Sequence, residues 1–284
     1  MKFNNSLLLA LIVVAGLFLF MQIYSIFSKS FLYAKETNYT SKSTVQSIDL
    51  QQIINEVLPP EGYESKAVWG NIVQDMIKAG ILDKEKLRAT LKQRYGQDLT
   101  PEMEEILNTP NLNKRIRIDK NNAVFMMYIL GIIAKHNNNS IIHNSPFKIP
   151  DIFSEAGRDG WGDVNLIKLT PEQQAIAEYV ANNAYRPCCG QPTSRPDCTH
   201  GFSLLGLIYI MASQGFSKEE IFRDALYFNA HWFPRHYTLL ALYFKVKENK
   251  DWKEVNPELA LSAEYSTVIA SRRIEQELRS MGII

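Results

Sequence analysis

The residues best suited to chemistry lie in one short stretch, residues 185–201, which contains every cysteine of the chain. Cys188, Cys189, Cys198 and His200 fall within thirteen positions, although the 284-residue chain has only three cysteines and five histidines. Thiolates combined with an imidazole are suitable ligands for Zn(II), Cu(I) or an iron centre. The stretch therefore predicts a metal ion bound by these four side chains, with the identity of the metal left open among zinc, copper and iron.

The spacing of the cysteines leaves two further interpretations open. Adjacent cysteines direct their side chains apart, so they chelate one ion less readily than a Cys-x-x-Cys pair. A disulfide between Cys189 and Cys198 would leave Cys188 as an odd thiol, which suits a thiol–disulfide oxidoreductase. A disulfide or a zinc ion that only staples the loop of a non-enzymatic interaction domain is the other alternative. The main prediction is metal handling or metal-dependent redox chemistry, with no particular reaction assigned.

Charged side chains near the thiols are expected to tune them. A helix predicted directly after the stretch would place its N-terminal amides beside Cys198 and lower the pKa of that thiol. Arg186 or Arg195 would act in the same direction. Asp197 is interpreted as a helix cap, with an orienting hydrogen bond to His200 as the alternative.

Two more histidines lie in an aromatic segment that could fold over the loop. His231 and His236 flank Trp232-Phe233-Pro234. They are five positions apart, one more than the pair that shares a helix face, and the proline disturbs the helix between them. We therefore predict that they are partly buried or surface histidines and not metal ligands.

Two motifs in the stretch, Arg186-Pro187-Cys188-Cys189-Gly190 and Asp197-Cys198-Thr199-His200-Gly201, carry a resemblance to other proteins. They are similar to those of a group of bacterial proteins of unknown function that share an Arg-Pro-Cys-Cys-Gly and an Asp-Cys-x-His-Gly pattern. The resemblance covers the body of the chain, including residues 170–174 and 232–234. The group has no assigned activity, so the resemblance implies no reaction and no catalytic residues, and it does not include His231 and His236 in its pattern.

The N-terminal region is nearly continuously apolar over residues 7–27, interrupted only by Gly16, Gln22 and Ser25. About 20 such residues suffice to cross a bilayer as a helix. Residues 1–27 are therefore predicted to be a single transmembrane anchor, with a cleaved secretory signal as the alternative. An anchor at this end usually acts as an export signal, so we expect the body on the extracytoplasmic side of the membrane, where oxidising conditions favour disulfides.

Composition divides the remaining chain and limits its partners. Residues 28–46 are rich in Ser, Thr, Lys and Asn and predict a flexible linker, and residues 47–284 predict one folded domain. The chain has 31 basic and 30 acidic side chains and no Lys/Arg cluster interleaved with aromatic residues, so nucleic acid is not an expected partner. The familiar sequence motifs of hydrolases, nucleotide-binding proteins and dehydrogenases are also missing.

Apolar residues recur at helical spacing through most of the body, and no run alternates strictly enough to predict a strand. The expected fold is all-α, an irregular multi-helix globular domain that follows the N-terminal transmembrane helix. The helices are expected over residues 48–58, 69–79, 83–96, 121–135, 170–185, 201–214, 217–230, 234–247 and 256–279, with a further short helix that starts at residue 100.

Overall fold

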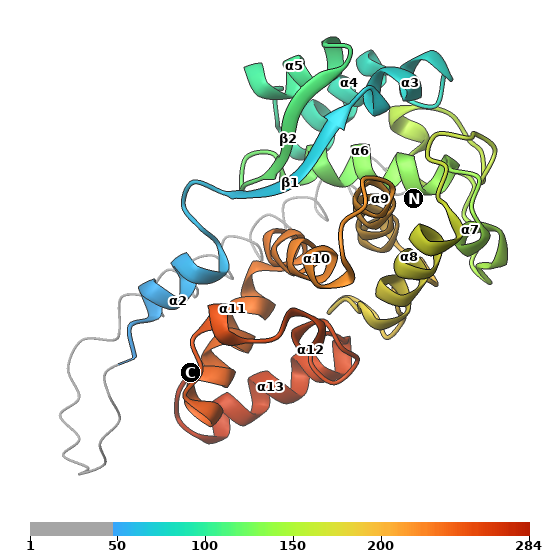
Figure 1. Ribbon diagram of the computed structural model, residues 1–284. Coiled ribbons are helices and arrows are strands. Elements are labelled where there is room, and N and C mark those ends of the chain that lie inside the picture. The colour runs from blue at the N-terminus through green and yellow to red at the C-terminus, as the bar shows by residue number, and fades with distance from the viewer. Residues whose placement is uncertain (1–47) are drawn as a thin grey trace, which may run out of the picture. The chain divides into compact units, whose positions relative to one another are not determined.

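The computed structural model describes residues 48–284, and this part of the chain is mostly helical, as predicted (Figure 1). Its α-helices are α2 (Leu50–Val57), α3 (Ile72–Lys78), α4 (Lys84–Tyr95), α5 (Pro101–Asn108), α6 (Ala123–His136), α7 (Ser140–Asn144), α8 (Pro171–Asn183), α9 (Thr199–Ser213), α10 (Lys218–Trp232), α11 (Pro234–Glu248), α12 (Pro257–Ala260) and α13 (Val268–Ser280). Two single turns of 3-10 helix, η1 (Ser154–Ala156) and η2 (Trp252–Glu254), and two strands, β1 (Tyr63–Gly70) and β2 (Leu112–Ile118), complete the regular structure of the described residues.

Helix α9 lies at the centre of the body, and α6, α8 and α10 pack around it (Figure 1). Both α6 and α9 are apolar on all sides, and both are buried along most of their length, which is the expected position for such helices. The two helices approach so closely that a Cβ atom at Gly206 would overlap the carbonyl group of Leu130. One turn earlier, Ser203 Oγ donates to the carbonyl of Met127 at 2.7 Å. These contacts fix the position of α9, whose first turn follows the cysteine loop.

Helices α8 and α10 begin at the capping boxes that the sequence predicts. Thr170 and Ser217 accept hydrogen bonds from the backbone N–H groups of Gln173 and Glu220, at 3.3 Å in both cases. In return, the side-chain oxygens of Gln173 and Glu220 accept hydrogen bonds from the backbone N–H groups of Thr170 and Ser217, at 3.0 and 3.1 Å. The start of α8 is thus set locally, and this helix delivers the chain to the cysteine loop.

The strands differ from the sequence analysis, which predicted none and placed Trp69 in a helix. Strands β1 and β2 pair antiparallel, and α3 begins only after β1 ends. In β1 the inward positions are Ser65, Ala67 and Trp69, all buried, but two of them are small or polar and weaken the visible alternation. In β2 a lysine, Lys114, interrupts the alternation of buried aliphatic residues. Buried and exposed positions therefore alternate along the strands, but apolar and polar residue types do not alternate in the same way.

The C-terminal segment also differs, because the single helix expected over residues 256–279 is broken into α12 and α13. The turn between them is held by Ser266, whose Oγ donates to the carbonyl of Ala260 at 2.7 Å and lies 2.9 Å from the Tyr237 hydroxyl. Directly after this turn, Val268 N donates to the carbonyl of Cys189 at 3.0 Å. The break thus brings the C-terminal segment against the cysteine loop.

The predicted transmembrane helix over residues 7–27 and the predicted linker over residues 28–46 lie outside the described residues. Residues 49–284 form one compact unit. Between residues 48 and 284, no helix is both long enough and apolar enough to cross a bilayer.

Candidate metal centre

The cysteine loop connects α8 to α9 and is held at its start by backbone hydrogen bonds. Thr193 donates to the carbonyl of Ala184 through its amide at 2.9 Å and through its hydroxyl at 2.7 Å. Tyr185 N donates to the carbonyl of Leu261, in the turn after α12, at 2.8 Å. The loop is therefore closed at its base and tied to the C-terminal segment, so its cysteines occupy defined positions.

Three of the predicted ligands converge. The ligand atoms of Cys188, Cys198 and His200 all lie within 4.8 Å of one another, with Cys188 exposed and the other two half-buried. The Sγ atoms of Cys188 and Cys198 are 3.7 Å apart. Two thiolates on one tetrahedral zinc ion, with Zn–S bonds of about 2.3 Å, would be about 3.8 Å apart, whereas the sulfur atoms of a disulfide are bonded at about 2.05 Å. This Cys/His group can hold a metal ion.

The fourth predicted ligand, Cys189, belongs to a second group. Its Sγ lies within 4.8 Å of Cys198 Sγ and of a carboxylate oxygen of Asp197, but it does not join the group that contains His200. Arg186 Nη2 donates to Cys189 Sγ at 3.2 Å and to Asp197 Oδ1 at 2.9 Å. The three thiols therefore lie close together, and Cys189 in addition accepts the hydrogen bond from Arg186. The ligand role of all four residues stays a prediction.

Arg186 is the largest fully buried side chain in the described part of the protein. Its pKa is raised: burial opposes the charge, but the three neighbouring thiols and the carboxylate of Asp197 outweigh burial. Arg195, the other arginine considered from the sequence, instead lies over the ring of Phe147, 5.9 Å from its centroid. The interpretation of Asp197 as a helix cap is wrong, because the cap position of α9 is Cys198 and the Asp197 carboxylate pairs with Arg186.

The pKa of Cys198 is lowered, whereas the pKa values of the other two thiols are raised. Hydrogen bonds from Cys188 and then Cys189 lower the pKa of Cys198 against the opposing effect of burial, and His200 and Arg186 lower it further. Hydrogen bonds to Cys189 and Cys198 raise the pKa of Cys188. The pKa of Cys189 is also raised, because a hydrogen bond with Cys198 and burial outweigh the lowering effect of Cys188. The lowered pKa favours the thiolate form of Cys198, which is the form that binds a metal ion.

The aromatic segment after α10 does fold against the loop, but through its aromatic side chains. The ring of His200 lies 4.4 Å from that of Phe233 and 6.2 Å from that of Trp232, centroid to centroid. His231 Nδ1 donates to the carbonyl of Tyr227 at 2.8 Å. Neither His231 nor His236 belongs to a potential metal-binding group among the described residues.

His236 lies deeper than the partly buried or surface position predicted from the sequence, because only 7% of it is exposed. Its side chain is buried near the ring of Tyr237, with ring centroids 4.8 Å apart. Burial lowers the pKa of His236 to about 4, although a hydrogen bond with the backbone of Tyr265 opposes the shift. This imidazole is therefore neutral at pH 7 and forms part of the core.

Gly201, the last residue of the second motif, is required by the packing of Arg186. A Cβ atom at Gly201 would lie 3.0 Å from Arg186 Cζ, and the guanidinium is held by several partners. We expect Gly201→Ala to lower the free energy of unfolding by about 1–2 kcal/mol, because overpacking outweighs the better helix propensity of alanine. Denaturation in urea measures this change.

The first motif provides the matched control for that substitution. A Cβ atom at Gly190 would meet no heavy atom within 4 Å, so Gly190→Ala is expected to change the free energy of unfolding by less than about 0.5 kcal/mol. Equal losses of stability in the two variants would contradict the role given to Gly201.

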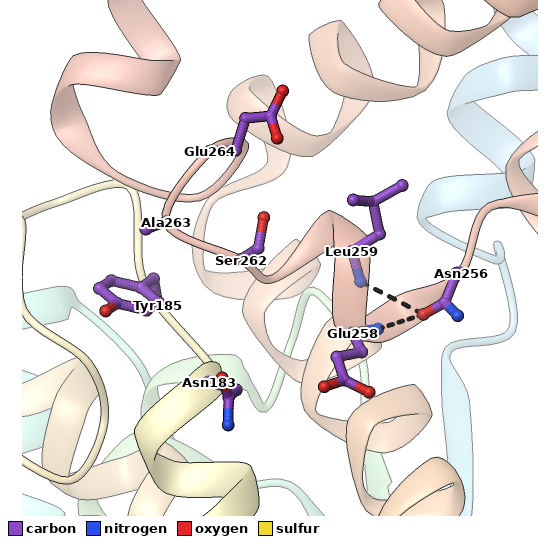
Figure 2. Close-up of a pocket in the computed structure, with 8 residues that line it drawn as sticks. All are labelled: Asn183, Tyr185, Asn256, Glu258, Leu259, Ser262, Ala263 and Glu264. Atoms are coloured by element: carbon purple, nitrogen blue, oxygen red, sulfur yellow. Dashed lines mark hydrogen bonds between the residues drawn. The ribbon is translucent and has the colours of Figure 1, made fainter.

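A pocket of about 710 Å³ lies beside the start of the cysteine loop, where Tyr185 lines it (Figure 2). Its lining residues are Asn183, Tyr185, Asn256, Glu258, Leu259, Ser262, Ala263 and Glu264. None of the cysteines lines this pocket, and neither does His200. The candidate metal centre is therefore a surface site separate from the pocket.

Sequence reasoning missed two residues that hold the centre together. Thr193 is buried and accepts a hydrogen bond from Arg186 Nη1 at 3.4 Å, and Gly201 makes room for the guanidinium. A threonine in a polar loop carries no recognisable signal of such a role. For Gly201 a signal existed, since a glycine in the first turn of a predicted helix lowers helix propensity and calls for a packing reason.

Comparisons with models of protein families, with curated proteins and with solved structures found no match. The resemblance of the two motifs to a bacterial group therefore stays a prediction. The geometry and chemistry of the cysteine loop are therefore the basis for a functional proposal.

Proposed function

We propose that this protein binds a soft or borderline metal ion, zinc, copper or iron, through a centre built on Cys188, Cys198 and His200. The role would be metal handling or a metal-dependent redox step. With the N-terminal anchor expected from the sequence, this chemistry would take place at the extracytoplasmic face of a membrane.

The observation that carries the proposal is the convergence of two thiols and one imidazole. The 3.7 Å separation of the Cys188 and Cys198 sulfur atoms matches two thiolates on one ion and is far from a disulfide bond. The pKa of Cys198 is lowered, first by its hydrogen bonds from the other two thiols, and this favours the thiolate form that a metal ion requires. His200 completes a set of ligand types that suits zinc and copper.

One alternative, a thiol–disulfide oxidoreductase, is supported by a specific observation. Cys198 is the N-cap residue of α9, where the helix dipole favours a thiolate, and Cys188 is the nearest thiol to it. The same arrangement suits a nucleophile and its resolving thiol. A structural disulfide or zinc staple is the other alternative, and the experiment below separates all three.

The test loads the reduced full-length protein with Zn(II) or with Cu(I), removes unbound ions and measures metal per chain by elemental analysis. We expect about one ion per chain in the wild type and a large loss of bound metal in Cys198→Ser, because that change removes the thiol whose pKa is lowered. His143→Ala is the matched control, since His143 lies outside the metal-binding groups and hydrogen-bonds to Asn138.

Titration of free thiols in the purified protein before reduction separates the alternatives. A protein that retains no metal and forms one disulfide would contradict the proposal, and a single fast-reacting thiol would then indicate the oxidoreductase. If metal binds but its loss in Cys198→Ser changes only the melting temperature, the ion is a structural staple.

A further inference from the structure

Cys189 lies close to Cys198, with the two ligand atoms within 4.8 Å of each other, but it does not belong to the group that contains His200. Its Sγ accepts a hydrogen bond from Arg186 Nη2 at 3.2 Å, and the same nitrogen donates to Asp197 Oδ1 at 2.9 Å. Arg186 is fully buried, so protein groups and not bulk water must satisfy its charge. The guanidinium therefore occupies the position beside Cys189 and Asp197 that a metal ion would need in order to use these two residues.

The backbone of Cys189 is fixed on both sides. Its amide donates to the carbonyl of Arg186 at 3.3 Å, and its carbonyl accepts from Val268 N at 3.0 Å. To reach an ion next to His200, the thiol would have to leave the guanidinium of Arg186. That movement would leave a buried cation with fewer partners, which is costly in a site closed to water.

The group formed by Cys188, Cys198 and His200 is accessible from outside. Cys188 is exposed, and the other two side chains are half-buried. Structural zinc sites use four protein ligands, whereas sites that act on other molecules use three and leave the fourth position to water or to a substrate. Three converging ligands at the surface correspond to the second type.

We propose, building on the function proposed above, that Cys189 is not a metal ligand and that the bound ion keeps its fourth coordination position open for an external thiolate. Soft and borderline ions favour thiolate ligands. An incoming thiolate could therefore bind the ion before Cys188, Cys198 or His200 is released. This is the ligand-exchange step that metal transfer to or from another thiol-containing molecule requires.

X-ray absorption at the edge of the retained ion, Zn(II) or Cu(I), counts the sulfur ligands in the full-length protein, which is reduced beforehand and kept under an oxygen-free atmosphere without added reductant. We expect two sulfur ligands in the wild type, two in Cys189→Ser and one in Cys188→Ser. Addition of 2-mercaptoethanol is expected to raise the count from two to three in both the wild type and Cys189→Ser. Cys188→Ser and Cys189→Ser are matched substitutions at neighbouring positions.

Arg186→Lys provides a second test of whether Arg186 keeps Cys189 away from the ion. Lysine lacks the planar fork that contacts Cys189 and Asp197 together, so the freed thiol is expected to take the open position and give three sulfur ligands without added thiol. If that variant does not fold, the comparison of Cys188→Ser with Cys189→Ser decides alone.

A count of three sulfur ligands in the wild type that falls to two in Cys189→Ser, with no response to added thiol, overturns the inference while leaving the proposed function intact. A wild-type protein without bound metal contradicts the proposed function itself.

Discussion

Asp197→Asn is expected to lower the free energy of unfolding of the reduced, metal-free protein by about 3 kcal/mol, because it leaves the buried charge of Arg186 without its carboxylate. Arg186 Nη2 lies 2.9 Å from Asp197 Oδ1, and the arginine side chain is fully buried. The loss is expected near the lower end of the range for a broken buried pair, since the Asp197 side chain is 23% exposed and the thiolate of Cys198 offsets part of the charge. Urea denaturation at pH 7 measures it.

A surface ion pair provides the control. Lys92 Nζ and Asp98 Oδ2 are 2.6 Å apart, but the Asp98 side chain is 78% exposed. Asp98→Asn should therefore change the free energy of unfolding by less than about 1 kcal/mol. If Asp197→Asn costs no more than Asp98→Asn, the Arg186 charge is not buried as described.

A double substitution tests the reason for the loss. Replacing both members of a buried ion pair by apolar residues of similar volume is often nearly neutral, because no unpaired charge remains. Arg186→Met combined with Asp197→Leu should therefore be more stable than Asp197→Asn alone. The opposite order would mean that the stability comes from other contacts of Arg186, such as the one with Thr193.

The parts of the fold that the sequence predicts well depend on interactions between close neighbours in the chain. The capping boxes at Thr170 and Ser217 involve residues three positions apart, so their pattern is visible without a structure. The two-stranded antiparallel sheet was missed because Ser65, Ala67 and Lys114 hide the alternation of its inward positions. The break between α12 and α13 depends on Ser266, which bonds to Tyr237 from a distant helix.

The candidate site also has features that are visible in the sequence and features that depend on tertiary packing. The clustering of cysteines with His200 identified the ligand types and the loop, because rare residues at short spacing are visible in the sequence alone. The hydrogen bond from Arg186 to Cys189 depends on the buried position of Arg186, which is set by the packing of α9 and by the loop base. Neither the pair of Arg186 with Asp197 nor the packing role of Gly201 could be derived from spacing.

The close contact between α6 and α9 leads to the second large effect. Gly206→Ala is expected to lower the free energy of unfolding by about 3 kcal/mol or more, because the added Cβ atom would overlap the carbonyl of Leu130 and neither backbone can move without separating two buried helices. Gly206→Ser should cost more, since its side chain is larger and polar. Thermal and urea unfolding of the two variants measure the order.

Ser213→Ala, at the last residue of the same helix, is the control for these substitutions. Ser213 is only half-buried and its hydroxyl bonds to the nearby carbonyl of Ile210, so a change of less than about 1 kcal/mol is expected. The close contact of Gly206 with Leu130 positions α9, and therefore also Cys198 at the start of this helix. Gly206→Ala should consequently weaken metal binding under conditions where the variant is still folded, although Gly206 is not among the candidate ligands. A stable Gly206→Ala variant with unchanged metal affinity would contradict this link between the helix pair and the centre.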